Sequence, residues 1–150
     1  MKGFAPLAQL FTRMALGIGF LLPVFDRLGF MGAPGSAQVA WGNWSNFVGY
    51  THTLIPFTSL HIAHIAGLVA TIAECILGLG LIVGYKTKWM GLGAALITIT
   101  FAAFMIASLG IGAPFKYPVF VFTGAGLLLS TQHLFPWSVD EFLRKRAGAK

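Results

Sequence analysis

The chain has 150 residues, of which 57% are hydrophobic and only 9% are charged, and its formal net charge is +6. A soluble domain carries about 25% charged residues and could not hide so many apolar side chains from water. This composition excludes a soluble enzyme, a disordered protein and a disulfide scaffold. The single Cys75 excludes an internal disulfide and an iron–sulfur cluster bound by thiolates of one chain.

Four apolar runs predict transmembrane helices, because a helix needs about 20 residues to cross the hydrocarbon core. The runs cover residues 7–28, 59–84, 89–109 and 117–135. They show no alternation of polar and apolar residues, which excludes membrane strands. The sequence therefore predicts an all-α integral membrane four-helix bundle, with residues 1–150 forming a single transmembrane domain.

Basic residues predict the orientation of this bundle. Four spans place both termini and the second connection on one side of the membrane. That side collects seven basic residues: Lys2, Lys86, Lys88, Arg144, Lys145, Arg146 and Lys150. The other side has Arg27 and Lys116. Because basic loops stay in the cytoplasm, both termini are expected there, and the positive charge indicates topology rather than a nucleic-acid partner.

The first connection has its own pattern. Trp41, Trp44, Phe47 and Tyr50 recur at helical spacing. This spacing predicts an amphipathic helix within residues 41–55 that lies in the membrane interface, where Trp and Tyr settle. Three roles fit such a segment: a lid over a cavity between the helices, a docking surface for a partner, or an anchor.

Glycines in the predicted spans indicate where helices approach each other. Glycine allows close backbone contact in lipid, where no hydrophobic effect drives association. We therefore expect packing seams at Gly78, Gly80, Gly84, Gly91, Gly93, Gly124 and Gly126. No glycine-rich segment matches a phosphate-binding loop.

Two charged residues lie well inside the predicted spans, where each charge costs roughly 2.5–3.5 kcal/mol or more. Glu74 lies about ten residues from the end of the second span, and Arg13 lies about six residues into the first. A buried Arg13–Glu74 ion pair is predicted, as a lock between helices or as a site where Glu74 carries a proton or binds a head group. At the outer rim, the favoured role of Asp26 and Arg27 is that of a simple anchor. In that role Arg27 is expected to reach outward, and Asp26 to face inward or to cap the connection.

Histidines offer a second candidate site. His61 and His64 lie on one face near the outer end of the second span. No metal site is predicted, because no carboxylate or thiolate set with metal-binding spacing accompanies them, and no haem is expected. They either hydrogen-bond to the loop or contact the polar head of a quinone-like ligand. No Ser/His/Asp set, carboxylate dyad or CxxC occurs, so the chain is not expected to catalyse a reaction alone.

Three segments carry a resemblance to a known family. The first span contributes Arg13, Gly17, Phe20 and Arg27-Leu28. The second span and its connection contribute Glu74, Gly78, Gly84, Lys86 and Lys88. The closing segment FPWSVDEFL contributes Pro136, Ser138 and Asp140. Together they resemble the DoxX family of small four-helix bacterial membrane proteins, which usually has His-Gly and Lys where this chain has Pro23-Val24 and Arg27.

The DoxX resemblance implies a function. That family includes the small subunit of a thiosulfate:quinone oxidoreductase, so we expect a membrane subunit of a quinone-linked redox complex that oxidises sulfur compounds or thiols. The quinone would contact Arg13, Glu74 and His61 or His64. The partners would be the lipid bilayer of the bacterial cytoplasmic membrane and a larger membrane or membrane-attached redox protein.

Other functions are left open. The main alternative is a non-catalytic scaffold or assembly subunit, whose aromatic connection and glycine seams dock a larger partner. A transporter for a small solute is a third hypothesis, and a homo-oligomer is compatible with all three.

Overall fold

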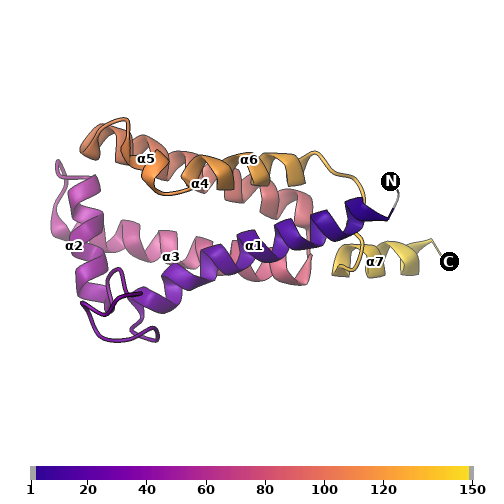
Figure 1. Ribbon diagram of the computed structural model, residues 1–150, viewed down its shortest axis with the longest axis horizontal. Coiled ribbons are helices and arrows are strands. Elements are labelled where there is room, and N and C mark those ends of the chain that lie inside the picture. The colour runs from indigo at the N-terminus through magenta and orange to yellow at the C-terminus, as the bar shows by residue number, and fades with distance from the viewer. Residues whose placement is uncertain (1–2, 149–150) are drawn as a thin grey trace.

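A computed structural model describes residues 3–148, and the regular elements in that range are all helices. Three helices are long and apolar enough to cross a membrane: α1 (Phe4–Arg27), α3 (Leu60–Val83) and α4 (Thr87–Leu109). They run along the long axis of the molecule and correspond to the first three predicted spans (Figure 1). Many large apolar side chains are exposed on these helices, which is consistent with contact with lipid.

The last predicted span, over residues 117–135, is only partly helical. It contains α6 (Val119–Ser130), which at 12 residues is about 18 Å long, shorter than the roughly 30 Å hydrocarbon core. Pro118 separates α6 from the short α5 (Ala113–Lys116), because a residue before proline avoids helical geometry, and Tyr117 is indeed extended.

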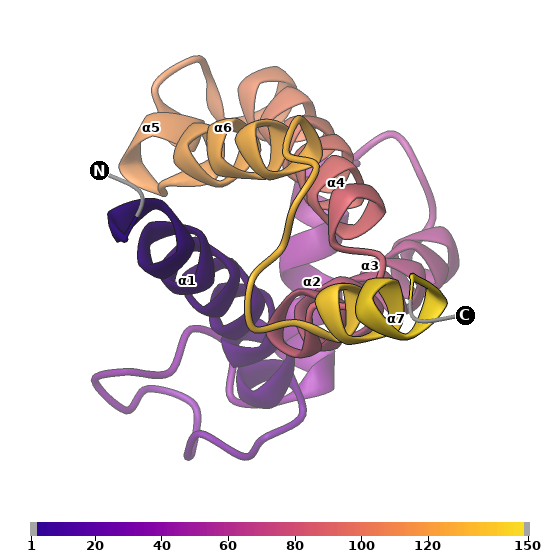
Figure 2. The same ribbon diagram turned by 90° about the vertical axis from the view of Figure 1, so that its right-hand side faces the viewer.

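Four helices pack in two pairs, α1 with α3 and α4 with α6, which Figure 2 shows end-on. In each pair, a glycine of one helix lies against a glycine of the other. α1 crosses α3 at Gly17 and Gly78, and α4 crosses α6 at Gly91 and Gly126. A Cβ atom on Gly126 would lie 2.6 Å from the carbonyl oxygen of Gly91, so only glycine allows this approach. In one half of the bundle the two pairs enclose a core of Leu16, Phe20, Leu77, Leu81, Ala94 and Leu129.

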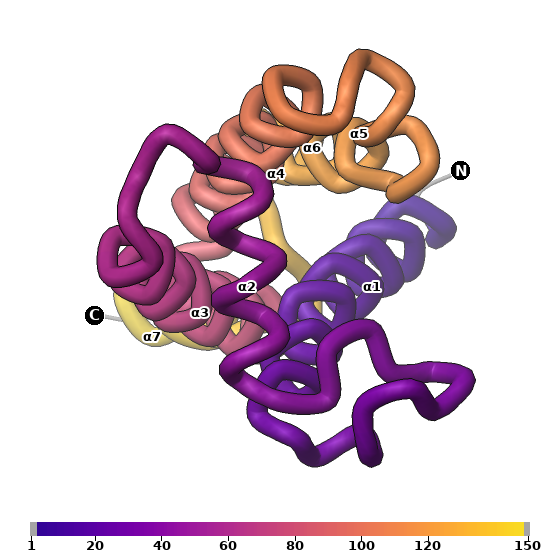
Figure 3. The backbone as a smooth tube through the Cα atoms, turned by 90° about the vertical axis from the view of Figure 1, so that its left-hand side faces the viewer, coloured from indigo at the N-terminus to yellow at the C-terminus, as the bar shows by residue number. Residues whose placement is uncertain are grey.

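The two ends of the bundle are closed differently. α2 (Trp44–Leu54) lies across one end, within the predicted segment 41–55 (Figure 3). Asn43 caps its N-terminus, because its side chain accepts a hydrogen bond from the Asn46 N–H at 2.8 Å. α7 (Val139–Ala147) lies at the other end, where α1 begins. There the Asp140 carboxylate accepts hydrogen bonds from the backbone N–H groups of Lys86 and Thr87, both at 2.7 Å, and so caps α4.

Candidate functional site

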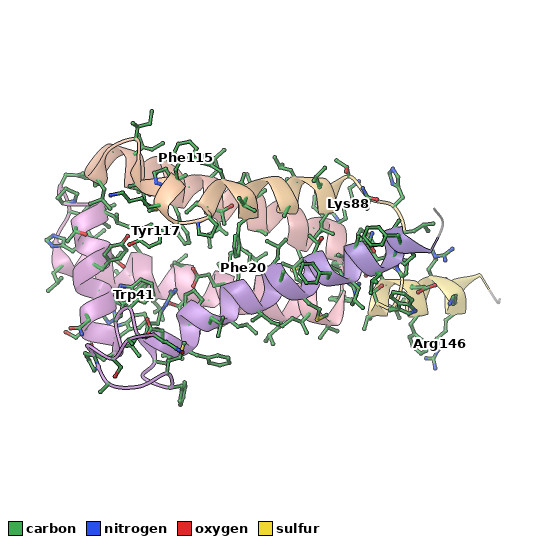
Figure 4. All side chains as sticks on the ribbon, viewed as in Figure 1. Phe20, Trp41, Lys88, Phe115, Tyr117 and Arg146 are labelled. Atoms are coloured by element: carbon green, nitrogen blue, oxygen red, sulfur yellow. The ribbon has the colours of Figure 1, made fainter. Side chains whose placement is uncertain are left out.

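A cavity of about 1400 Å³ lies in the half of the bundle next to α2. Helices α1, α3 and α4 supply most of its walls, and α2 lies across its end. Most of the lining side chains are apolar, and the charged ones among them are Asp26, Arg27 and Glu74. In Figure 4 Trp41 and Tyr117 lie toward the α2 end, whereas Phe20 of the packed core lies near the middle of the bundle.

Arg27 and Glu74 form a buried ion pair in the wall of this cavity. Arg27 Nη2 lies 2.6 Å from Glu74 Oε2, and the two side chains are 2% and 6% exposed. Arg27 also donates hydrogen bonds to the Pro23 carbonyl oxygen at 3.0 Å and to the Thr71 hydroxyl at 2.8 Å. Such extra bonds help to offset the desolvation of a buried pair. Within the described residues, these contacts use three of the five guanidinium N–H groups.

Aromatic side chains cover the Arg27 guanidinium on the side of α2. Its central carbon lies 4.0 Å from the ring centre of Phe47 and 5.4 Å from that of Trp41, which are cation–π distances. Phe47 fits there because Gly67 of α3 has no side chain: a Cβ atom on Gly67 would lie 2.9 Å from Phe47 Cε1. The aromatic segment predicted from the sequence therefore lies against the ion pair.

Asp26 fixes the connection that carries Trp41. Its carboxylate is buried and accepts hydrogen bonds from the backbone N–H groups of Ala40 at 3.1 Å, Trp41 at 2.9 Å and Gly42 at 3.1 Å. The prediction that Asp26 faces inward or caps the connection is confirmed. Two neighbouring residues of α1 therefore have different tasks. Asp26 holds the connection that carries Trp41, and Arg27 forms the ion pair with Glu74.

We expect Asp26→Ala to loosen residues 40–42 while the long helices keep their packing, because three backbone N–H groups lose a charged acceptor. Hydrogen–deuterium exchange of the purified protein should show these amides exchanging roughly tenfold faster or more. Asp140→Ala is the matched control, since it removes a similar carboxylate cap at the opposite end. Unchanged exchange at residues 40–42 in Asp26→Ala would contradict this role of Asp26.

The predicted ion pair between Arg13 and Glu74 is wrong. Arg13 is fully buried at the opposite end of the bundle, where its Nη2 donates to the Trp137 carbonyl oxygen at 2.9 Å. The prediction that Arg27 reaches outward is wrong as well, since Arg27 is the partner of Glu74. Side chains on a helix lean toward its N-terminus, so Arg13 reaches away from Glu74, whereas Arg27 in the last turn of α1 reaches back into the bundle.

His61 and His64 lie outside the cavity. Both are exposed, and together with Trp44 and Leu60 they line a separate groove of about 490 Å³ between α2 and α3. The ring centres of His64 and Trp44 are 5.5 Å apart in an edge-on arrangement. The structure therefore brings neither histidine to Glu74. Among residues 3–148, no group of three or more His, Cys, Asp or Glu side chains could hold a metal ion.

Sequence reasoning missed three polar residues of the site. No part in ligand binding was predicted for Thr71, Tyr50 or Tyr117. In the structure, the Thr71 hydroxyl accepts a hydrogen bond from Arg27, and both tyrosines line the cavity. Burial, together with the nearby Tyr117, raises the pKa of the Tyr50 phenol above its usual value, so this phenol keeps its proton at neutral pH. The helical spacing of Thr71 from Glu74 and of Tyr50 from Phe47 could have revealed the first two. No sequence signal marked Tyr117.

Comparisons of the chain with protein-family models, curated proteins and solved structures find no match. The cavity itself indicates what the site can bind. Its wall combines a large apolar surface with one ion pair, an arrangement suited to a ligand with a polar head and an apolar body.

Proposed function

We propose that the protein is a membrane subunit that binds a quinone and serves a larger redox protein. The observation that carries this proposal is the Arg27–Glu74 pair in the wall of an otherwise apolar cavity. Guanidinium N–H groups of Arg27 would donate to a quinone carbonyl oxygen, and the Glu74 carboxylate would accept a hydrogen bond from a quinol hydroxyl. A quinone held there supplies two-electron, two-proton redox chemistry.

The aromatic cover supports this proposal. Phe47 and Trp41 lie over the guanidinium and reduce its contact with water, which strengthens hydrogen bonds made by the ion pair. Of the three roles open to the aromatic segment, we favour the lid. The resemblance to the DoxX family adds that the partner would be an enzyme that oxidises sulfur compounds or thiols and passes the electrons to the quinone.

The same proposal includes a membrane setting. α1, α3, α4 and the α5–α6 segment would form four spans of the bacterial cytoplasmic membrane, and α2 would lie at the outer interface. α6 is short, but α5 also contacts α4 and lengthens the path alongside it. Lys88 and Arg146 lie toward the end opposite α2, which supports cytoplasmic termini (Figure 4). Lys2 and Lys150, which also entered the topology prediction, lie outside the described residues.

Extraction from the native membrane in mild detergent tests the proposal. Mass spectrometry would identify every protein and lipid-soluble molecule that stays with the chain. A redox enzyme and a quinone in near-equal amounts are the expected result. A large complex without quinone would favour the scaffold function instead, and a bundle with ordinary lipid alone would contradict both functions.

We expect Glu74→Gln to leave the complex assembled and to lower its quinone-dependent electron transfer roughly 10- to 100-fold. The variant keeps the size of the side chain and an amide oxygen that can accept a hydrogen bond from Arg27, so the buried guanidinium keeps an acceptor. It loses a charge-assisted hydrogen bond, which is worth about 1.5–3 kcal/mol. Electron transfer to an added quinone measures the effect, and size-exclusion chromatography checks assembly. Glu141→Gln, at the opposite end of the bundle, is the control. Equal rates in both variants would rule out a role for Glu74 at the quinone.

A further inference from the structure

The cavity reaches the outer surface of the bundle between α3 and α4. Its lining includes side chains with a large exposed fraction: Val69 of α3 is 62% exposed and Leu96 of α4 is 59% exposed. The same cavity contains Arg27 and Glu74, which are buried. One cavity therefore extends from exposed side chains of α3 and α4 to the buried ion pair.

Packing contacts define the limits of this opening, the α3–α4 window. On the side of the core, α3 and α4 meet where Leu77 fits against Gly93, and a Cβ atom on Gly93 would lie 2.6 Å from Leu77 Cδ2. On the side of α2, the Ser108 hydroxyl donates to the Leu54 carbonyl oxygen at 2.6 Å and ties α4 to α2. Between these contacts α3 presents the small side chain of Ala70, which leaves space.

The chemistry of the α3–α4 window favours an apolar chain. The residues that line it from the two helices include Val69, Ala70, Leu96, Ile97 and Phe104, and none of them is charged. Entry beside α2 would instead meet the connection that the hydrogen bonds of Asp26 hold in place. The passage through the window requires no polar group to leave its partner.

We propose that the ligand is a lipid quinone with a long isoprenoid tail, which enters from the bilayer through the α3–α4 window. Its head lies against Arg27 and Glu74, and its tail lies in the window between Ala70 and Leu96. This inference rests on the proposed quinone function and adds the class of quinone and its route. It predicts that the tail contributes to affinity, because the window buries apolar surface of the tail.

Two window variants test this inference in lipid nanodiscs. Ala70→Trp fills the passage from α3, and Leu96→Trp narrows it from α4. Ile72→Trp and Ile99→Trp are matched controls, because these residues are 51% and 50% exposed on the same helices but do not line the cavity. The probes are a menaquinone with a long isoprenoid tail and a dimethyl naphthoquinone without one, and retention of each probe on the purified protein measures binding.

We expect the two window variants to bind the long-tailed menaquinone roughly tenfold more weakly or worse, because displaced methylene groups lose their burial. Binding of the probe without a tail should stay close to that of the unmodified protein. If a window variant changes both probes equally or neither, or if the control variants weaken the long-tailed menaquinone as much, the proposed route is overturned. If the unmodified protein binds neither probe, the quinone function itself fails.

Discussion

Arg27→Met is expected to lower the free energy of unfolding by about 3–5 kcal/mol, the usual cost of removing one partner of a buried ion pair. The Glu74 carboxylate would stay buried without its cation, since no other Lys or Arg side chain lies within 4.0 Å of it among the described residues. Unfolding of the purified protein in mixed micelles by increasing SDS, followed by circular dichroism, measures the loss.

The double variant Arg27→Met/Glu74→Met should recover most of that stability, because apolar residues of similar size often replace a buried pair without cost. Lys145→Met is the control: it breaks the exposed Lys145–Glu141 pair at 2.9 Å and should leave the unfolding curve unchanged. If the double variant is as unstable as Arg27→Met, the two charges do not stabilise the fold through each other.

The double variant also separates structure from function. A buried ion pair is weak evidence for stability, since an apolar pair serves a fold as well or better. If the double variant folds normally, the fold does not require these charges, and their position in the cavity wall needs another reason. Binding of a polar head group supplies one. We therefore expect a stable double variant that no longer retains a quinone.

The sequence predicted the three long helices because their apolar runs are long enough to decide the structure alone. It overestimated the fourth, because Pro118 and the residues after Thr131 interrupt helical geometry within an apolar run. The Arg27–Glu74 pair required more than depth along each helix. It depends on the direction in which side chains lean and on where α1 and α3 cross. The crossing at Gly17 and Gly78 places Arg13 beside Gly84 rather than beside Glu74.

The prediction of packing seams was correct for some glycines and wrong for others, because it did not include where the helices cross. Apolar composition marks a glycine as lying in a span, but only the crossing of two helices decides which glycines touch. Gly126 lies against the backbone of α4, whereas a Cβ atom on Gly124, two residues earlier, would meet nothing within 4 Å. The same helix thus contains one glycine that packing requires and one that it does not.

Gly126→Ala is expected to lower the free energy of unfolding by about 1–3 kcal/mol, the usual cost of overpacking. Its Cβ atom would lie 2.6 Å from the Gly91 carbonyl oxygen and 2.9 Å from the Ala95 nitrogen. Both are backbone atoms, which cannot rotate away as a side chain could, so α6 must move from α4. The SDS unfolding assay measures this loss.

Gly124→Ala makes the same chemical change in open space and controls for helix propensity. Alanine favours a helix over glycine by roughly 0.5–1 kcal/mol, so Gly124→Ala should be neutral or slightly stabilising. If Gly126→Ala stabilised the protein equally, propensity rather than close backbone contact would determine the effect, and the α4–α6 crossing would tolerate a wider separation. Opposite signs for the two variants would instead show that the approach of the two backbones holds α6 against α4.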